Sequence, residues 1–247
     1  MPRLIPSRLA AACGLALILI LTTATVAAAK KVEADLRVVG KGGKVLADTS
    51  LKTGPTKVPT SSKATCFGKG TGGSGTKYAS GGPTALGLLS QAASSTKELK
   101  PLLITDAFVD EFGLGICGVG GSTSTSKLSW YLKVNHKNPN LGGEKVKLKS
   151  GDDVLWALES FPYPNELALE GPETATAGVP FEVKVFSYDD KGKRKPAVGA
   201  SVTGATAPTG SDGKATVTIS APTTLRATHG KEIPSNGVGV CLAGVCP

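Results

Sequence analysis

Aromatic residues are scarce in this sequence: they make up 5% of its 247 residues, whereas glycine and proline occur 32 and 16 times. A chain with few large aromatic side chains and many turn formers is typical of several short strands rather than of a helical enzyme core. The length allows one large domain or two ordinary ones, each with enough chain to bury a core. We therefore expect a mainly β protein.

Histidine is also scarce, which argues against an enzyme. The two histidines are His136 and His229, so a Ser-His-Asp arrangement would have to be built around one of them. The acids within 106–111 lie between expected strands, where carboxylates usually face solvent rather than act as an acid–base set. The segment 113–118 fits Gly-x-Gly-x-x-Gly, but the Gly-Ser-Thr-rich residues after it will not begin the helix that a dinucleotide site requires. We predict no catalytic residue and no cofactor, and an enzyme of unrecognised type is the least favoured alternative.

The first 29 residues have the pattern of an export signal. Arg3 and Arg8 precede an apolar segment at 9–21, and the small residues at 26–29 would suit cleavage. The charge-free run 9–29 could instead span a bilayer as an uncleaved anchor. Three threonines interrupt this run, so we favour cleavage. The prediction is a protein that is secreted or displayed on the cell surface, with no membrane attachment after cleavage.

Basic residues outnumber acidic residues after this segment, by 26 to 19, which gives a net charge of +7. Four lysines (Lys133, Lys145, Lys147 and Lys149) fall on expected polar strand faces, and no aromatic stacking motif accompanies them. Nucleic-acid readers usually combine a basic face with a recognisable module, so we predict no nucleic-acid partner. A basic surface would instead attract an anionic wall polymer through long-range electrostatics.

Both tryptophans lie in the stretch 129–159, around which the first half of the chain is organised. It contains three alternating apolar runs: Trp130, Leu132 and Val134; Val146 and Leu148; and Val154, Trp156 and Leu158. Period-two spacing predicts half-buried strands. Aromatic side chains in such strands usually belong to a hydrophobic core.

The same stretch carries a family resemblance. Trp-Tyr-x-x-x-Asn at 130–135 and Gly-Asp-x-Val-x-Trp at 151–156 resemble the C-terminal half of the transcobalamin C-terminal-like domain, which many bacterial surface proteins carry without an assigned function. Residues 83–89 are similar to that family's single-helix motif, and the resemblance covers about 31–160. It implies an α+β, β-grasp-like module in which one helix lies on a small mixed sheet. His136 departs from the family, which commonly has a glycine after the asparagine.

Local signals within this module predict its elements. Strands are expected at 32–39 and 45–51, joined by a glycine-rich hairpin turn, and at 102–109 and 112–119. A helix is expected over 84–93, directly after a proline. The thirty residues from Thr53 to Gly82 are long for a connection in a compact domain, so we expect a mobile or functional loop.

The paired prolines of Phe-Pro-Tyr-Pro at 161–164 favour an extended linker. We therefore expect domains at 30–160 and 165–247 with few packing ties between them. Short strands then recur about every 8–12 residues, as in an all-β sandwich. Thr-x-x-x-Gly-x-Ala at 209–215 resembles a signature of bacterial immunoglobulin-like repeats, which implies an immunoglobulin-like sandwich.

Four cysteines follow the signal segment. An even number in an exported chain indicates disulfides, with three possible connectivities. The pairing that we expect is Cys66 with Cys117 inside the first module and Cys241 with Cys246 at the C-terminus. A structural zinc site needs four Cys or His ligands, and no second pair accompanies Cys-x4-Cys at 241–246, so we predict no metal.

Three hypotheses for function remain. The favoured one is a non-catalytic binding or adhesion protein of unknown ligand, and the alternatives are a small-molecule binder, by analogy with cobalamin capture by the resembled family, and an enzyme. The candidate ligand-binding residues are Trp130, Tyr131, Asn135, His136 and Asn138. They lie on or next to a loop that, with the glycine-rich loop 68–82 and its Lys69 and Lys77, would suit an anionic partner. The alternative is that these loops are solvated connections. An apolar cleft beside the tryptophans, rather than filled core, would favour a small molecule.

Overall fold

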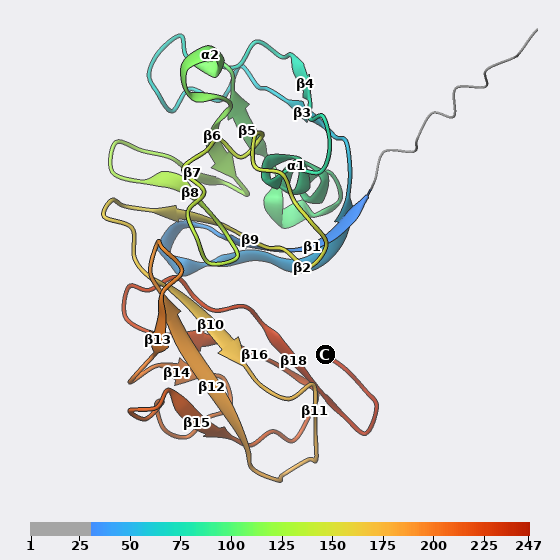
Figure 1. Cartoon of the computed structure of the whole chain (residues 1–247), viewed down its shortest axis with the longest axis vertical. Helices are drawn as coiled ribbons and strands as arrows, with labels where there is room; N and C mark the ends of the chain where they lie inside the picture. The colour runs from blue at the N-terminus through green and yellow to red at the C-terminus, as the bar shows by residue number, and fades with distance from the viewer. Residues whose placement is uncertain (1–30) are drawn as a thin grey trace, which may run out of the picture.

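The computed structural model describes residues 31–247, so the predicted export signal at 1–29 lies outside the described residues. Within 31–247, no helix is both long enough and apolar enough to cross a membrane. The structure is mainly β, as predicted, and its strands form several sheets. Figure 1 shows two parts stacked along the long axis, which the chain joins between β9 and β10.

A four-stranded sheet in the order β2-β1-β9-β8 organises the first part. Its strands are β1 (Val32–Val39), β2 (Val45–Thr53), β8 (Ser129–Val134) and β9 (Asp153–Glu159). β1 pairs antiparallel with β2 and parallel with β9, and β8 pairs antiparallel with β9. The predicted hairpin and two of the three alternating runs therefore form one sheet.

One face of this sheet is covered by α1 (Ala85–Ser95). The Thr84 hydroxyl accepts a hydrogen bond from the Gly87 N–H at 3.1 Å, as a helix N-cap does. Leu86 and Leu89 of α1 lie in one buried cluster with Leu36 of β1. Two small sheets complete the first part: β3 (Lys57–Pro59) with β4 (Lys77–Ala79), and β5 (Leu102–Thr105), β6 (Gly115–Val119) and β7 (Ser122–Thr123), with the single-turn α2 (Val109–Phe112) between β5 and β6.

The segment Val146–Leu148 does not form the predicted strand. Both residues are buried, but the carbonyl of Val146 accepts from the Ala85 N–H at 3.0 Å, and the carbonyl of Gly143 accepts from the Leu86 N–H at 3.0 Å. The first N–H groups of a helix lack partners within the helix. The loop that contains Gly143 and Val146 supplies two of those partners. The apolar alternation at 146–148 therefore reflects packing against α1 rather than pairing within the sheet.

The strands predicted at 102–109 and 112–119 are both shorter than expected. β5 ends at Thr105, and α2 occupies the residues that follow. Gly113 then turns the chain with φ of 84°, a left-handed conformation that suits glycine, and β6 starts two residues later. The expected loop 53–82 includes β3 and β4 and is otherwise irregular.

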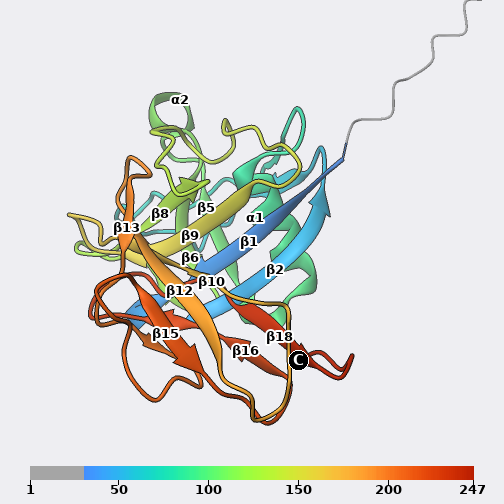
Figure 2. The ribbon, with the colours of Figure 1, turned by 60° about the horizontal axis from the view of Figure 1, so that its bottom comes forward.

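The second part contains two larger sheets and one two-stranded sheet, which share one core (Figure 2). The first joins β10 (Glu166–Glu170), β12 (Phe181–Tyr188), β13 (Arg194–Pro196) and β15 (Lys214–Val217). The second joins β11 (Thr174–Ala175), β18 (Val238–Leu242) and β16 (Thr223–Leu225), and β14 (Ser201–Val202) pairs separately with β17 (Ala227–Thr228). Leu169 and Val183 from one sheet share the core with Leu225 and Val240 from the other.

Both predicted disulfides are confirmed: Cys66 is bonded to Cys117, and Cys241 to Cys246. The first bridge fastens the irregular segment 60–76 to β6. The second closes the C-terminal hairpin after β18.

The expectation of few packing ties between the two parts is wrong. Val39, Leu155 and Ala157 of the first sheet form a buried cluster with Ile233 of the second part. Lys133, which we expected on a polar face, is completely buried. The second part covers the sheet face opposite α1, so both faces of β1 and β9 are buried instead of one.

Candidate functional site

The structure separates the five predicted site residues into two regions. Trp130, Tyr131 and Asn138 line a groove in the first part. His136 lines a different cleft, at the junction of the two parts. Asn135 lines neither the groove nor the cleft. Its side-chain Nδ2 donates to Asp152 Oδ1 at 2.9 Å, and its side-chain Oδ1 accepts from the Asp153 N–H at 3.0 Å.

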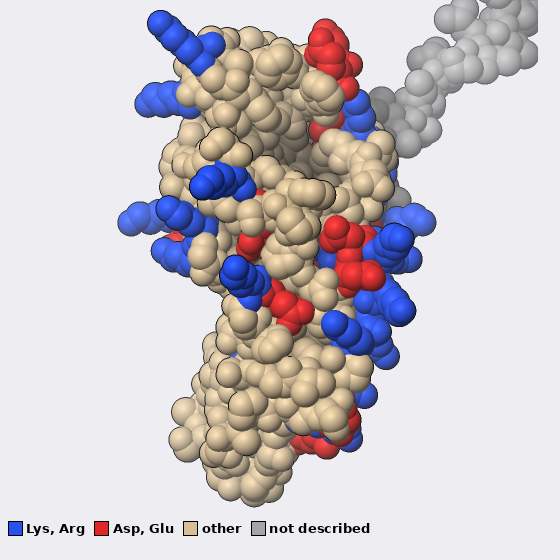
Figure 3. Space-filling view, turned by 90° about the vertical axis from the view of Figure 1, so that its left-hand side faces the viewer, with Lys and Arg blue, Asp and Glu red and all other residues tan. Residues whose placement is uncertain are grey.

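The groove has a volume of about 750 Å³, which lies within the range of small-molecule sites in proteins. Figure 3 shows the molecule from the left-hand side of Figure 1, with a hollow among uncharged atoms in the upper part. None of the residues that line the groove is Lys, Arg, Asp, Glu or His. In a chain with 28 basic and 19 acidic residues, an uncharged lining of this size is a distinctive feature.

Aromatic and aliphatic side chains make up the walls of the groove. Phe112 is 79% exposed and Leu141 is 59% exposed, and both line it. Phe67 packs edge-on against Phe108 with 5.8 Å between ring centroids, and the neighbouring Cys66–Cys117 bridge fastens this wall to β6. Polar lining groups are neutral hydroxyls and amides: Thr105, Ser124, Thr125, Ser126, Ser129, Asn138 and Asn140.

Trp156 forms the floor of the groove and belongs to the hydrophobic core, as the period-two pattern predicted. It is 5% exposed, and its indole N–H donates to the Ala85 carbonyl at 3.4 Å. Gly143 lies directly on the ring: a Cβ at this position would be 2.6 Å from Trp156 Cζ2. Any side chain at Gly143 would therefore force the indole or the loop to shift.

Tyr131 connects the groove to the second part. Its ring stacks on Tyr163 with 3.9 Å between centroids, and its hydroxyl donates to Asp190 Oδ1 at 2.6 Å. Burial, and then the hydrogen bond to the Asp190 carboxylate, raise the pKa of Tyr131 well above its ordinary value. The phenol thus stays a neutral donor throughout the physiological range.

The glycine-rich loop 68–82 does not contribute to the groove. None of the residues 68–82 lines the groove, so Lys69 and Lys77 are not part of it. Cys66 and Phe67, immediately before that loop, do line it. The irregular segment therefore contributes to the groove through Cys66 and Phe67, which the disulfide holds in place, and not through its glycine-rich residues 68–82.

At the junction, Glu166 is a fully buried carboxylate that three groups of the first part surround. Glu166 Oε1 pairs with Arg37 and also lies 3.0 Å from His136 Nδ1, while Oε2 lies 3.4 Å from Lys133 Nζ. Burial alone would raise the pKa of Glu166, but the His136 hydrogen bond and the Arg37 charge lower it below its ordinary value. Arg37 also donates to the backbone carbonyls of Leu167 and Pro234. This network holds the two parts together.

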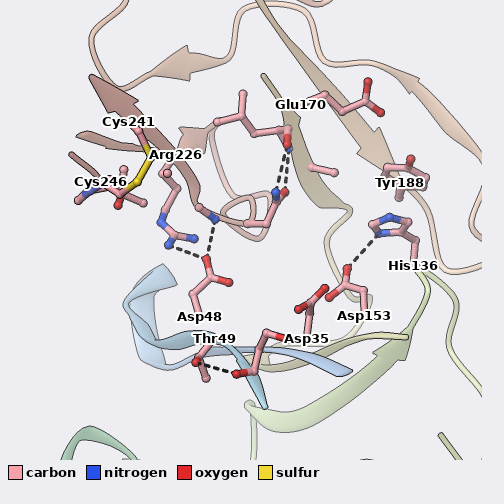
Figure 4. Close-up of a pocket in the computed structure, with 18 residues that line it drawn as sticks. Asp35, Asp48, Thr49, His136, Asp153, Glu170, Tyr188, Arg226, Cys241 and Cys246 are labelled. Carbon is pink, nitrogen blue, oxygen red and sulfur yellow. Dashed lines mark hydrogen bonds and ion pairs between the residues drawn. A yellow bond between two sulfur atoms is a disulfide. The ribbon is translucent and has the colours of Figure 1, made fainter. Parts of the chain in front are cut away.

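His136, Asp153 and Glu166 lie close enough for one metal ion to contact all three. Figure 4 shows Asp35 and Asp153 side by side below His136 in a cleft of about 650 Å³. Arg37 and Lys133, however, already neutralise Glu166, and a divalent cation there would be repelled by both at short range. The arrangement is that of a buried ion network rather than of a metal centre.

His136 is not the solvated loop residue that its position beside a turn indicated. It stacks on Tyr188 of the second part with 3.8 Å between ring centroids. Its backbone φ is 67°, a left-handed conformation that costs a non-glycine residue more than it costs glycine. No sequence signal pointed to the ion pair between Arg37 and Glu166, because the two residues lie 129 positions apart and on different strands.

Compared with protein-family models and with curated proteins, the chain matches none of them. The groove is the feature of the described residues that points most directly to a function.

Proposed function

We propose that this chain is an extracellular, non-catalytic binding protein whose groove holds a neutral ligand with a broad apolar face. The observation that carries the proposal is the uncharged lining, with aromatic and aliphatic walls, of a groove of about 750 Å³. Binding sites for small molecules are typically concave and apolar, with a few polar groups that fix orientation. The hydroxyl and amide groups along this groove would take that orienting role.

The side chains of the groove favour a neutral ligand over an anionic one. An anion would have to leave water without meeting a cationic side chain, which is costly. A carboxylate stands just behind the lining: both oxygens of Glu144 are buried without a hydrogen-bond partner among the described residues, and a Cβ on Gly113 or Gly142 would meet them. Its negative potential would repel an anion further. An anionic wall polymer, which the basic surface suggested, is thus the weaker candidate for this groove.

The apolar cleft beside Trp130 and Trp156 favours the small-molecule hypothesis over simple adhesion. Within this proposal, the first module would be of the transcobalamin C-terminal-like kind, with a β-grasp-like sheet and helix. The second module would be an immunoglobulin-like sandwich that supports the first. Both assignments stem from the sequence motifs, and the two disulfides support an oxidising, extracellular location.

A matched pair of fluorescent probes tests the proposal. N-phenyl-1-naphthylamine is neutral, and 8-anilino-1-naphthalenesulfonate differs from it by one sulfonate. We expect the mature chain to bind the neutral probe at least about ten-fold more tightly, because the sulfonate would lose its hydration without gaining a partner. Equal affinity, or tighter binding of the sulfonate, would overturn the neutral-ligand proposal.

Two phenylalanines provide the matched variants for the same titration. Phe112 lines the groove and Phe161 does not, yet they are 79% and 83% exposed. Phe112→Ala should weaken binding of the neutral probe by roughly ten-fold through loss of apolar contact area. Phe161→Ala, which removes an equally exposed ring, should leave binding unchanged. Similar losses in both variants would mean that the probe binds elsewhere.

A further inference from the structure

We propose that Asp190 of the second part is a positioning residue for the groove of the first part, so that the two parts form one ligand site. The inference rests on the proposed function of the groove and adds how that site is held and regulated. The contacts that carry it all run between the turn 188–191 and the strand and loop at 131–138.

The first contact fixes a groove side chain. Tyr131 is 3% exposed, and a buried phenol needs a hydrogen-bond partner. Asp190 Oδ1 accepts the Tyr131 hydroxyl hydrogen at 2.6 Å, and the Asn138 side chain also interacts with this hydroxyl. Without the Asp190 carboxylate, the buried hydroxyl would lose its charged acceptor, and only the Asn138 side chain of the groove wall would remain to hold it.

The second set of contacts fixes the groove wall. The Asn138 N–H donates to the Asp190 carbonyl at 3.0 Å, and Lys137 forms an isolated β-bridge with Lys191. Lys133, buried beneath the loop, donates from Nζ to the carbonyls of Tyr188 and Asp189 at 3.3 and 3.0 Å. The turn of the second part thus holds the start of the 138–143 wall at several points.

The turn itself is rigid enough to act as a support. Asp189 Oδ1 accepts from the N–H groups of Lys191 and Lys193, both at 2.9 Å. These bonds define the turn locally, and β12 and β13 carry it. A ligand that contacts Tyr131 and Asn138 therefore stabilises the docked arrangement of the two parts, and docking favours ligand binding by the same factor.

A double-mutant cycle on Tyr131 and Asp190 tests the proposal in the full mature chain. Asp190→Ala should weaken binding of N-phenyl-1-naphthylamine by about ten-fold, which is the scale of one hydrogen bond to a charged group. Asp190→Asn keeps an acceptor oxygen and should restore most of the affinity. Tyr131→Phe should give a loss similar to that of Asp190→Ala, and the double variant no further loss, because both changes remove the same bond.

A control variant and a second measurement distinguish the positioning role of Asp190 from the proposal that the groove binds a neutral ligand. Glu173→Ala removes an exposed acid of the second part and should leave all measurements unchanged. Amide hydrogen exchange without any probe should show residues 136–143 exchanging faster in Asp190→Ala than in wild type, by roughly ten-fold. If the probe does not bind wild type, the groove proposal fails while this exchange result still decides the role of Asp190. Unchanged exchange, or additive losses in the cycle, would overturn the positioning role.

Discussion

Glu166 is the residue on which the junction depends most. Its carboxylate is completely buried and compensates Arg37 and Lys133, which are also buried. Removing one partner from a buried ion network leaves uncompensated charge in a poorly solvated place, whereas an exposed pair contributes little. The consequence of a substitution at this position should therefore be large and should depend on pH.

We expect Glu166→Gln to destabilise the folded chain by about 3–5 kcal/mol at pH 7. The pKa of Glu166 is lowered in the folded state, so its contribution to stability is present above the unfolded pKa of about 4.3 and is lost as pH falls through the folded pKa. Urea unfolding at several pH values should show the gap between wild type and variant narrowing below about pH 4. Glu170→Gln, on the same strand but 58% exposed at the side chain, should change stability by less than about 1 kcal/mol.

The pKa of Asp153 is shifted in the opposite direction to that of Glu166, so its effect on stability should change with pH in the opposite sense. Burial, and then the nearby Glu166 charge, raise the pKa of Asp153 against the attraction of Arg37. Because the pKa of Asp153 is raised in the folded state, the contribution of this group to stability is fully present below the unfolded pKa of about 3.9. That contribution is lost as the pH rises through the folded pKa. Asp153→Asn should therefore be more stable than wild type at pH 7, by about 1 kcal/mol, and no more stable at pH 3. A loss of stability at pH 7 in the same urea series would show that the Arg37 attraction outweighs burial.

The residues of the groove were partly predictable from the sequence. Trp130, Tyr131 and Asn138 could be found because aromatic and amide groups cluster around a turn. The environment of His136 and Lys133 could not be found, because period-two alternation marks which residues share a face but not what covers that face. For β8, the second part covers the face expected to be polar, and Lys133 is buried there with carbonyl partners.

At the scale of elements, the loop 138–148 joins the groove to α1. It supplies carbonyl partners to the first amides of the helix and places Gly143 against the Trp156 ring. Strand alternation, the glycine-rich hairpin turn and the proline before the helix were visible in the sequence, and they predicted β1, β2, β8, β9 and α1. The loop was mistaken in part for a strand, because burial against a helix end produces the same apolar alternation as burial in a sheet.

Gly143→Ala tests the close contact between the loop 138–148 and the Trp156 ring. The added Cβ would lie 2.6 Å from Trp156 Cζ2, so the indole or the loop must shift, at a cost of about 1–3 kcal/mol. The expected readouts are a lower urea midpoint, a changed tryptophan emission maximum and weaker binding of the neutral probe. Gly210→Ala is the matched control, because its Cβ would have no neighbour closer than 3.4 Å. Equal effects of the two substitutions would contradict the close approach at Gly143.

At the scale of the whole molecule, two separate cores share one interface. The larger clusters lie within 32–156 and 167–242, one on each side of the predicted linker at 161–164. Between them lie the Glu166 network and a small apolar cluster around Ile233. The linker motif predicted where the chain changes from one part to the other. It could not reveal the interface, since proline fixes the local backbone and says nothing of the strands on either side.

The interface should make the two parts unfold together. Both tryptophans, Trp130 and Trp156, belong to the first part, so tryptophan fluorescence follows that part alone, whereas far-UV circular dichroism follows both. In thermal unfolding of wild type at pH 7, we expect the two signals to give the same midpoint, as a single cooperative transition requires. In Glu166→Gln, the interface loses its central charge and the two midpoints should separate by roughly 5–10 °C, while Glu170→Gln keeps them coincident. Separate midpoints in wild type would mean that the two parts unfold independently, which would contradict both the stabilising role of the interface and the coupling between the groove and the second part.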